Sequence, residues 1–359
     1  MKILHIVNVQ AIANGITSVV VNLMKYQQML GCMVKAINLN KTAESIQDID
    51  KIYGKKEFIS IVETFNPDIV IFHGIFYKEI ITFSSILRRR STPYLIQLHG
   101  AYSRMNYRHN KCIKYIFKKC FLSKCIKSSH GVIFLNERER NNCVLLGLMN
   151  KTIILPNGCE INSNLGGSRW MNKSKTINLL YIGRIDIHHK GLDLLVGALK
   201  KEINIPDYKI RLNIYGAGSR EDVNFIKNSL KDATIEVEYH PAVYGRDKDI
   251  IFRKSNILLL TSRYEGFPMT LLEGWSYGLP SLITPETNMS DIVIHNNCGW
   301  VTSPNIDAIN ANLIKAINEY INDKAGYYTR SIETAKYYEW SKIAKLSINL
   351  YKTLISYED

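Results

Sequence analysis

The sequence predicts an α/β protein made of two Rossmann-like domains, each with a doubly wound parallel sheet. Its 359 residues exceed what one ordinary hydrophobic core accommodates. Short apolar runs typical of strands alternate with stretches of helical spacing in both halves, and the turn-rich interval from Pro156 to Thr176 separates them. We therefore place an N-terminal domain at residues 1–160, a linker at 161–176 and a C-terminal domain at 177–339. Strands that alternate with helices indicate parallel sheets, which bind ligands at the carboxyl ends of their strands.

The first half contains six apolar runs with the length and composition of strands, separated by segments of helical periodicity. The predicted strands are Ile3–Val7, Met33–Leu39, Ile69–Phe72, Tyr94–Leu98, Val132–Leu135 and Thr152–Leu155. The predicted helices are Thr17–Leu30, Ile59–Phe65, Tyr77–Arg89 and Glu137–Leu146.

The second half repeats this alternation. The predicted strands are Ile177–Ile182, Ile210–Tyr215, Thr234–Val237, Ile257–Leu260, Ser281–Ile283 and Trp300–Val301. The predicted helices are Leu192–Lys200, Glu221–Leu230, Asp247–Lys254 and Thr270–Tyr277, followed by helical spacing from Ile306 onward. Two such domains facing each other across a cleft form the simplest arrangement.

Composition favours a cytosolic protein. The apolar run at the start is short and contains His5, so we do not expect a signal peptide. No uninterrupted apolar stretch approaches the roughly 18–20 residues that span a bilayer. The seven cysteines form no CxxC pair and no zinc spacing, which favours reduced thiols.

The net charge of +14 is concentrated in one segment. Between Ile80 and Asn136 there are eleven Lys and Arg residues and no Asp or Glu, whereas the rest of the chain has 35 basic and 32 acidic residues. The positive charge is therefore a local property of the first half. There we expect the residues Arg88, Arg89, Arg90, Arg104 and Arg108 to add charge without any acidic partner.

The most informative segment is TSRYEGFPMTLLEGWSYGLP, residues 261–280. Pro268 suits the first position of a helix, whose initial amides would favour a phosphate. Glu265 lies before this helix and Glu273 on its second turn, so both carboxylates can face one ligand with hydroxyl groups, such as a sugar. The alternative is an exposed helix with two solvated glutamates. Gly266, Gly274 and Gly278, which a purely structural helix would avoid, argue against it.

Two basic residues follow the first strand of the C-terminal domain. Arg184 leaves that strand and Lys190 precedes a helix that opens at Gly191. Both cations therefore lie at the carboxyl end of the sheet, where they can hold a diphosphate without a metal ion. The neighbouring His188 and His189 are explained by exposure in a loop.

These residues resemble family 4 of the retaining glycosyltransferases, which have the GT-B fold. The matching elements are Glu265 and Glu273 with seven residues between them, Gly183-Arg184 with Lys190-Gly191, and Gly216-Ala217-Gly218. The resemblance covers essentially the whole chain. The stretch from Tyr338 to Tyr351 is similar to the family's last helix, which implies that about residues 340–359 complete the N-terminal domain.

The resemblance implies a role for each matching residue. His99 would act at the reacting centre and Glu265 would contact the hydroxyls of the transferred sugar. Arg184 and Lys190 would bind the donor diphosphate, and Glu273 the ribose. Further donor contacts are implied for Gly15, Gly266, Phe267, Pro268, Met269, Thr270 and Leu271. Asp291 falls where many members carry Glu, and Tyr239-His240-Pro241 lies near the family's base contact.

The resemblance also implies a mechanism. Retention without a carboxylate nucleophile indicates front-face substitution, in which the leaving diphosphate helps to deprotonate the acceptor hydroxyl. Because no Asp-x-Asp element is present in a suitable loop, we expect no metal requirement and no cofactor beyond the nucleotide diphosphate sugar. UDP is preferred over GDP on family frequency alone.

The basic segment suggests the acceptor side. Helical spacing places Lys111, Lys114 and Lys118 on one face of residues 109–121, which a buried helix with a solvated basic rim also explains. The wider segment favours an anionic membrane surface over nucleic acid, since no nucleic-acid motif accompanies the charge. Candidate acceptor or membrane contacts are Arg104, Arg108, His109, Lys111, Lys114 and Lys118.

The sequence thus predicts a hexosyl- or N-acetylhexosaminyltransferase at the inner face of a bacterial cytoplasmic membrane, acting on a lipid-linked glycan in O-antigen, capsule or exopolysaccharide synthesis. One alternative is a GT-B epimerase or hydrolase that needs no acceptor. A second is a catalytically silent binding subunit, against which the presence of Arg184, Lys190, Glu265 and Glu273 argues.

Overall fold

A computed structural model describes residues 1–9, 15–40, 42–52, 54–75, 77–100, 122–161 and 175–355. The chain forms two compact units. The N-terminal unit combines Met1–Gly158 with Trp340–Asp359, and the C-terminal unit comprises Cys159–Glu339. Residues 162–174, most of the predicted linker, lie outside the described part of the chain.

The N-terminal unit is built on a parallel sheet with the order β3-β2-β1-β4-β5-β6-β7. Its strands are β1 (Lys2–Val7), β2 (Met33–Asn38), β3 (Ile49–Lys51), β4 (Ile69–His73), β5 (Tyr94–Gln97), β6 (Gly131–Phe134) and β7 (Thr152–Ile154). The strand order reverses between β1 and β4. In a doubly wound sheet this reversal opens a crevice at the carboxyl ends of the strands, where ligands bind.

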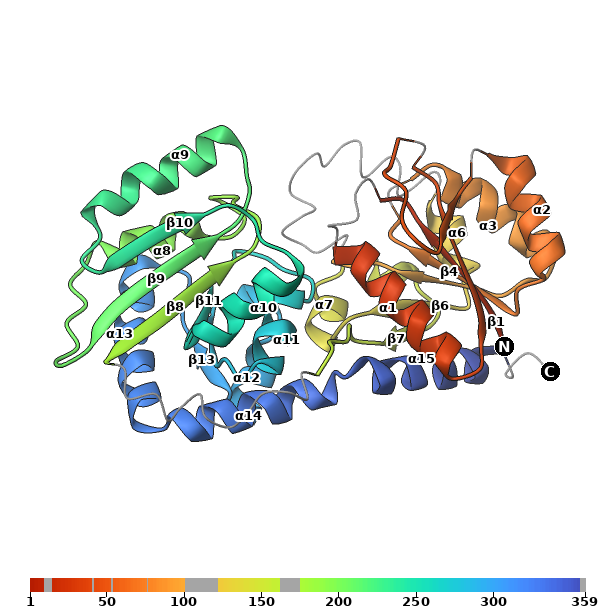
Figure 1. The fold of residues 1–359 in the computed structure, drawn as a ribbon. Helices are drawn as coiled ribbons and strands as arrows, with labels where there is room; N and C mark the ends of the chain where they lie inside the picture. The colour runs from red at the N-terminus through yellow and green to blue at the C-terminus, as the bar shows by residue number, and fades with distance from the viewer. Residues whose placement is uncertain are drawn as a thin grey trace. The chain divides into compact units, whose positions relative to one another are not determined.

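Helices cover both faces of this sheet (Figure 1). They are α1 (Gly15–Met29), α2 (Lys55–Phe65), α3 (Glu79–Arg89), α6 (Ser123–Lys127), α7 (Glu137–Asn141), a 3-10 turn at Leu146–Leu148, and α15 (Trp340–Ile355). Leu4, Phe72 and Ile96 from the strands pack with Phe58 and Phe83 from the helices in one core. On the other face α15 packs against α1. The chain returns to this unit at the start of α15, where Trp340 is buried against Gly158. A Cβ on Gly158 would lie 2.5 Å from the indole ring of Trp340.

The C-terminal unit has a second parallel sheet, with the order β10-β9-β8-β11-β12-β13. Its strands are β8 (Thr176–Ile182), β9 (Lys209–Tyr215), β10 (Glu236–His240), β11 (Ile257–Leu260), β12 (Ser281–Ile283) and β13 (Gly299–Val301). The helices are α8 (Leu192–Leu199), α9 (Arg220–Ser229), α10 (Gly245–Lys254), α11 (Met269–Ser276), α12 (Ser290–Asn296), α13 (Ile306–Asn322) and α14 (Lys324–Tyr337), with 3-10 turns at Leu230–Asp232 and Pro285–Thr287. The order reverses between β8 and β11.

The prediction of two Rossmann-like parallel-sheet units is confirmed. The predicted strand Thr234–Val237 instead forms at Glu236–His240, since Thr234 is tied to the end of α8 through its amide and Leu199 O, 2.9 Å apart. The helix predicted at Glu137–Leu146 ends at Asn141. The short elements β3 and α12 were missed, because three to seven residues hold too little periodicity to be recognised.

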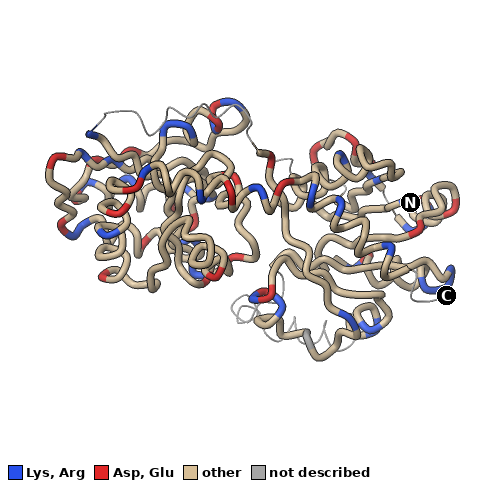
Figure 2. The backbone as a smooth tube through the Cα atoms, turned by 90° about the horizontal axis from the view of Figure 1, so that it is seen from below, with Lys and Arg blue, Asp and Glu red and all other residues tan. Residues whose placement is uncertain are grey.

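In its described part, the basic segment has an acidic partner. Arg90 forms an ion pair with Glu63 of α2, so the expectation that Arg88, Arg89 and Arg90 lack partners is wrong for Arg90. The partner comes from outside the segment because α2 packs beside α3. In the C-terminal unit, on the left of Figure 2, basic and acidic positions are interspersed. Among the described residues, no helix combines the length and the hydropathy needed to cross a bilayer.

Candidate functional site

The loops after β8 and β11 meet at the reversal of strand order in the C-terminal unit. Gly191, at the end of the first loop, has a φ of +60°, and a Cβ there would lie 2.1 Å from Thr261 O. The Thr261 hydroxyl in turn donates to the carbonyls of Lys190 and Gly191, each at 3.2 Å. Only glycine permits this close approach of the two backbones. The contact fixes where Lys190 lies relative to the loop that carries Glu265.

Lys190 and Glu265 form an ion pair at this junction. Lys190 Nζ lies 2.5 Å from Glu265 Oε1, and the side chains are only 15% and 11% exposed. Ser262 also donates to Oε1, at 2.7 Å, whereas Oε2 accepts no hydrogen bond from a described residue. The site therefore presents a half-satisfied carboxylate beside a sheltered ammonium group. Such a pair suits a ligand that brings both hydroxyls and negative charge.

Arg184 lies at the same end of the sheet but is more open, with 61% of its side chain exposed. It contacts Asp186 Oδ2 at 3.2 Å and donates to His189 Nδ1 at 2.7 Å. His189 then donates through Nε2 to Tyr264 O at 2.8 Å, and its ring stacks on Tyr264 with centroids 3.9 Å apart. Burial, together with the charge of Lys190, lowers the pKa of His189, so this ring is neutral.

His189 is therefore a structural part of the site, and the interpretation of it as an exposed loop residue is wrong. A second link supports the same loop. Arg263 donates to both oxygens of Asp193 at 2.7 Å, and its Nη1 also donates to His188 O at 2.8 Å. This bidentate pair joins α8 to the loop after β11. The loop that carries both expected cations, Arg184 and Lys190, is thus held by residues of the loop after β11.

Helix α11 begins directly after Glu265-Gly266-Phe267. Pro268 occupies the N-cap position, so the helix starts at Met269, one residue after the start that Pro268 indicated and one before the predicted range Thr270–Tyr277. The amide of Leu271 donates to Pro268 O at 3.1 Å, and no side chain among the described residues caps this end, so the amides of Met269 and Thr270 remain available to an anion. Phe267 is buried and contacts the ring of Tyr338 edge-on, at 5.7 Å between centroids.

Gly274 in α11 and Gly278 after it have structural causes, so the inference that these two glycines indicate a ligand is wrong. A Cβ on Gly274 would lie 2.7 Å from Leu258 of β11. Gly278 ends the helix with a φ of +73° and packs under the ring of Tyr328. Close packing and chain reversal therefore explain Gly274 and Gly278.

Glu273 is separately paired. Its Oε2 accepts a hydrogen bond from Lys248 of α10 at 2.7 Å. Both side chains are about one-third exposed, so the carboxylate remains reachable from solvent. Lys248 was not identified from the sequence.

Glu286 is a further acidic residue that the sequence analysis missed. Its carbonyl accepts from the amide of Glu265 at 2.9 Å, and its buried Oε2 has no hydrogen-bond partner among the described residues. Asn288 donates to Glu265 O at 2.6 Å and so holds the same turn. Asp291 is exposed instead, and lines a pocket of about 670 Å³ with Tyr337 and Tyr338.

In the N-terminal unit, the candidate residues follow β1 and β5. Gly15 is exposed and opens α1, and a Cβ there would meet no described atom within 4 Å. His99 and Gly100 form the turn after β5, and both have positive φ, +51° and +78°. Left-handed backbone at a histidine is uncommon and requires outside support.

Glu139 of α7 supplies that support. Its Oε1 accepts from the amide of Gly100 and its Oε2 from the amide of Leu135, both at 2.5 Å. Burial raises the pKa of Glu139, and the two amide hydrogen bonds counteract that rise. Asn136 caps α7 by accepting from the amide of Glu139 at 2.7 Å. The turn that carries His99 is therefore fixed by a buried carboxylate that the sequence analysis did not identify.

Three histidines from adjacent strands form a hydrogen-bonded line behind this turn. His99 Nε2 lies 2.9 Å from His73 Nδ1, and His73 Nε2 lies 2.8 Å from His5 Nδ1. His5 Nε2 continues to Gln27 Oε1 of α1 at 2.9 Å, and Gln27 Nε2 donates to Ser347 Oγ of α15 at 2.9 Å. We call His5, His73 and His99 the histidine relay. Burial lowers the pKa of His5 and of His99 to about 4, and that of His73 well below its usual value.

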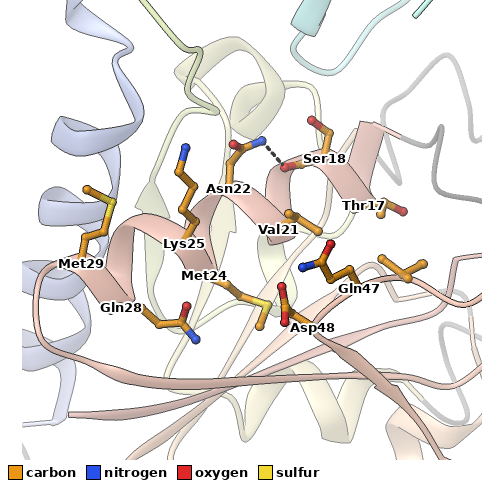
Figure 3. Close-up of a pocket in the computed structure, with 11 residues that line it drawn as sticks. Thr17, Ser18, Val21, Asn22, Met24, Lys25, Gln28, Met29, Gln47 and Asp48 are labelled. Carbon is orange, nitrogen blue, oxygen red and sulfur yellow. Dashed lines mark hydrogen bonds between the residues drawn. The ribbon is translucent and has the colours of Figure 1, made fainter. Parts of the chain in front are cut away.

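A separate pocket of about 800 Å³ lies between α1 and the segment before β3 (Figure 3). In Figure 3, Met24 of α1 lies beside Gln47 and Asp48. The residues lining this pocket include none of the predicted site residues. The candidate acceptor or membrane residues Arg104, Arg108, His109, Lys111, Lys114 and Lys118 lie outside the described part of the chain.

The fold places the chain among known proteins. The two parallel-sheet units have the GT-B fold: a glycosyltransferase from Rickettsia africae aligns over 99% of this chain and 98% of its own, with a TM-score of 0.74 and 18% identity. Anabaena HepE, solved in complex with UDP, aligns over 98% and 99%, with a TM-score of 0.72 and 14% identity.

Sequence comparison identifies the C-terminal unit more closely. Residues 169–336, within this unit and its linker, match the family model "Glycosyl transferases group 1". An uncharacterised glycosyltransferase of Methanocaldococcus jannaschii is 23% identical over 64% of this chain and 58% of its own length. An O-antigen chain mannosyltransferase of Escherichia coli is 27% identical over 33% of this chain and 30% of its own. The chain thus spans less than two thirds of either relative.

Proposed function

We propose that the protein is a glycosyltransferase that moves a hexose or N-acetylhexosamine from a nucleotide diphosphate sugar to a glycan acceptor, with retention and without a metal ion. The observation that carries the proposal is the Lys190–Glu265 pair, which lies at the reversal of strand order immediately before the uncapped end of α11. A group 1 glycosyltransferase domain surrounds it.

The chemistry of a donor matches this arrangement. The diphosphate draws Lys190 Nζ and Arg184 toward its oxygens, and the first amides of α11 add partial positive charge. Glu265 loses its partner Lys190 and gains hydroxyls of the transferred sugar as hydrogen-bond donors. Glu273 accepts hydrogen bonds from the ribose. Lys190 and Glu265, which pair with each other in the absence of ligand, thus each gain a partner in the donor.

The reaction follows from these positions. The bond between the anomeric carbon and the diphosphate oxygen breaks, and its electron pair stays on the diphosphate, where Arg184, Lys190 and the amides stabilise the growing charge. The acceptor hydroxyl oxygen bonds to the anomeric carbon on the same face and passes its proton to the departing diphosphate. His99 stabilises the positive charge that develops on the sugar.

Three observations support finer details of the proposal. The UDP complex of Anabaena HepE supports UDP as the nucleotide. The similarity to an O-antigen chain mannosyltransferase supports surface-polysaccharide synthesis. The excess of basic residues between Ile80 and Asn136 supports a lipid-linked acceptor at the inner face of the bacterial cytoplasmic membrane.

The test is release of nucleotide diphosphate from a panel of UDP- and GDP-sugars, with and without lipid-linked acceptors. We expect acceptor-dependent release by the wild type, a loss of at least about a hundredfold in Glu265→Ala, and no loss in the exposed control Glu333→Ala. Product formed equally without acceptor would favour the epimerase or hydrolase. No release from any donor would favour the silent binding subunit.

A further inference from the structure

The buried end of the histidine relay sets the direction of all its hydrogen bonds. In the structure Ser347 donates its hydroxyl proton to Ala344 O at 2.7 Å, and its oxygen accepts from Gln27 Nε2 at 2.9 Å. The amide oxygen of Gln27 must then face His5, and His5 Nε2 must carry the proton between them.

The same direction passes along the relay. A neutral imidazole has one donor and one acceptor nitrogen, so His5 Nδ1 accepts from His73 Nε2, and His73 Nδ1 accepts from His99 Nε2. If the hydrogen bonds ran in the opposite direction, His5 Nε2 would carry a lone pair that faces the lone pair of Gln27 Oε1, 2.9 Å away and buried. A protonated ring is disfavoured because burial lowers the pKa of each histidine.

The parallel register explains how the line forms. His5 pairs with Ile71, two residues before His73, and His73 pairs with Gln97, two residues before His99. Side chains two residues apart in a strand share a face. The three rings therefore rise diagonally across β1, β4 and the turn after β5, from α1 and α15 to the candidate site.

We propose that His5, His73 and Gln27 are positioning residues that hold His99 as one neutral tautomer, whose Nδ1 can only accept a hydrogen bond. The hydroxyl that donates to it belongs to the transferred sugar, and this part alone rests on the proposed function. A hydroxyl that donates to a neutral acceptor becomes more electron-rich, which favours the positive charge of the sugar in the transition state. Ser347 anchors the relay from the C-terminal helix.

The first test is NMR of protein labelled with ¹⁵N-histidine at pH 7, which needs no substrate. We expect couplings through the hydrogen bonds from His99 Nε2 to His73 Nδ1 and from His73 Nε2 to His5 Nδ1, and an unprotonated Nδ1 at His99. A protonated Nδ1 at His99, or missing couplings, would overturn the proposal even if the protein transfers sugar.

The second test compares His73→Gln, which keeps a donor and an acceptor, with His73→Leu, which has neither. For His73→Leu we expect kcat to fall about tenfold, equal to about 1.4 kcal/mol in activation free energy, with KM for the donor changed less. His73→Gln should stay within about threefold of the wild type.

The control is Phe72→Leu, which alters the opposite, buried face of the same strand and leaves the relay intact. Equal losses of kcat in His73→Gln and His73→Leu, or the same loss in Phe72→Leu at a matched loss of stability, would contradict a positioning role. A wild type without transfer or hydrolysis would count against the proposed function, and the NMR result would then decide the proposal.

Discussion

Lys190 of the loop after β8 and Glu265 of the loop after β11 neutralise each other at 2.5 Å, although 75 residues separate them in the sequence. Each side chain is mostly withdrawn from solvent, so removing one leaves a poorly solvated charge on the other. The pair consequently links the stability of the C-terminal unit to the proposed binding of a donor.

Lys190→Met should lower the free energy of unfolding by about 1–3 kcal/mol, because it leaves Glu265 without its cation. It should also weaken donor binding, because the ammonium group for the diphosphate is lost. Chemical denaturation and donor titration measure the two effects. The double variant Lys190→Met/Glu265→Gln should regain stability and remain inactive. Recovery of activity in the double variant would rule out a direct role for the pair in binding.

Gly191→Ala and Gly245→Ala form a matched pair. Both glycines have positive φ, +60° and +54°, and each precedes or opens a helix, but only at Gly191 would a Cβ meet the backbone of Thr261. We expect Gly245→Ala to cost about 1 kcal/mol from backbone conformation and Gly191→Ala to cost at least about 1 kcal/mol more, from the displaced loop. Urea unfolding measures both, and equal losses would contradict the close contact.

Glu139→Gln tests the turn that carries His99. The carboxylate of Glu139 accepts a hydrogen bond from two backbone amides, whereas the side chain of glutamine has one acceptor and one donor and can accept from only one of them. The turn should therefore loosen, and kcat should fall by about tenfold. Glu137→Gln, two residues earlier and paired with Arg140 at the surface, is the control and should leave kcat unchanged. A kcat for Glu139→Gln equal to that of the control would show that the turn does not need this carboxylate.

The histidine relay predicts acid sensitivity. Burial lowers the pKa of His5 from 6.5 to about 4, so between these values the unfolded chain binds a proton that the folded chain does not. Stability is therefore constant above about pH 6.5 and falls as the pH drops toward 4, by about 2 kcal/mol at pH 5 for His5 alone. His73, with its pKa lowered by burial and by its histidine neighbours, adds to the same loss.

Unfolding free energies between pH 4 and 8 measure this slope. The control is Phe72→Leu, which leaves the relay intact and should keep the pH dependence of the wild type. His5→Leu, which has no imidazole at this position, should make the unfolding free energy depend less steeply on pH. An unchanged slope in His5→Leu would mean that other groups cause the acid sensitivity.

The strand ends were predictable because the alternation of apolar runs and helices is strong in both halves. This alternation placed Lys190, Glu265 and His99 after the carboxyl ends of parallel strands, where they lie in the structure. The pairing of Lys190 with Glu265 was not predictable, since it depends on the close approach of Gly191 to Thr261.

The hydrogen bonds that link His99 to its supporting residues were not predictable, for a related reason. His5, His73 and His99 are 68 and 26 residues apart, and only the parallel register brings them into line. Arg263 and Asp193 are likewise 70 residues apart, and only the folding of the chain brings them together. Gly274 and Gly278 misled the sequence analysis, because a glycine required by packing against a strand or an aromatic ring has the same sequence pattern as one required by a ligand.

Binding of a nucleotide diphosphate sugar at Lys190 and Glu265 is the central claim. It is tested most directly by thermal unfolding of the wild type, Lys190→Met and Glu333→Ala across a panel of these donors. One donor at a hundredfold excess over its dissociation constant should stabilise the wild type and Glu333→Ala by about 2.7 kcal/mol and leave Lys190→Met nearly unaffected. Equal stabilisation of all three proteins, or none by any donor, would contradict the claim.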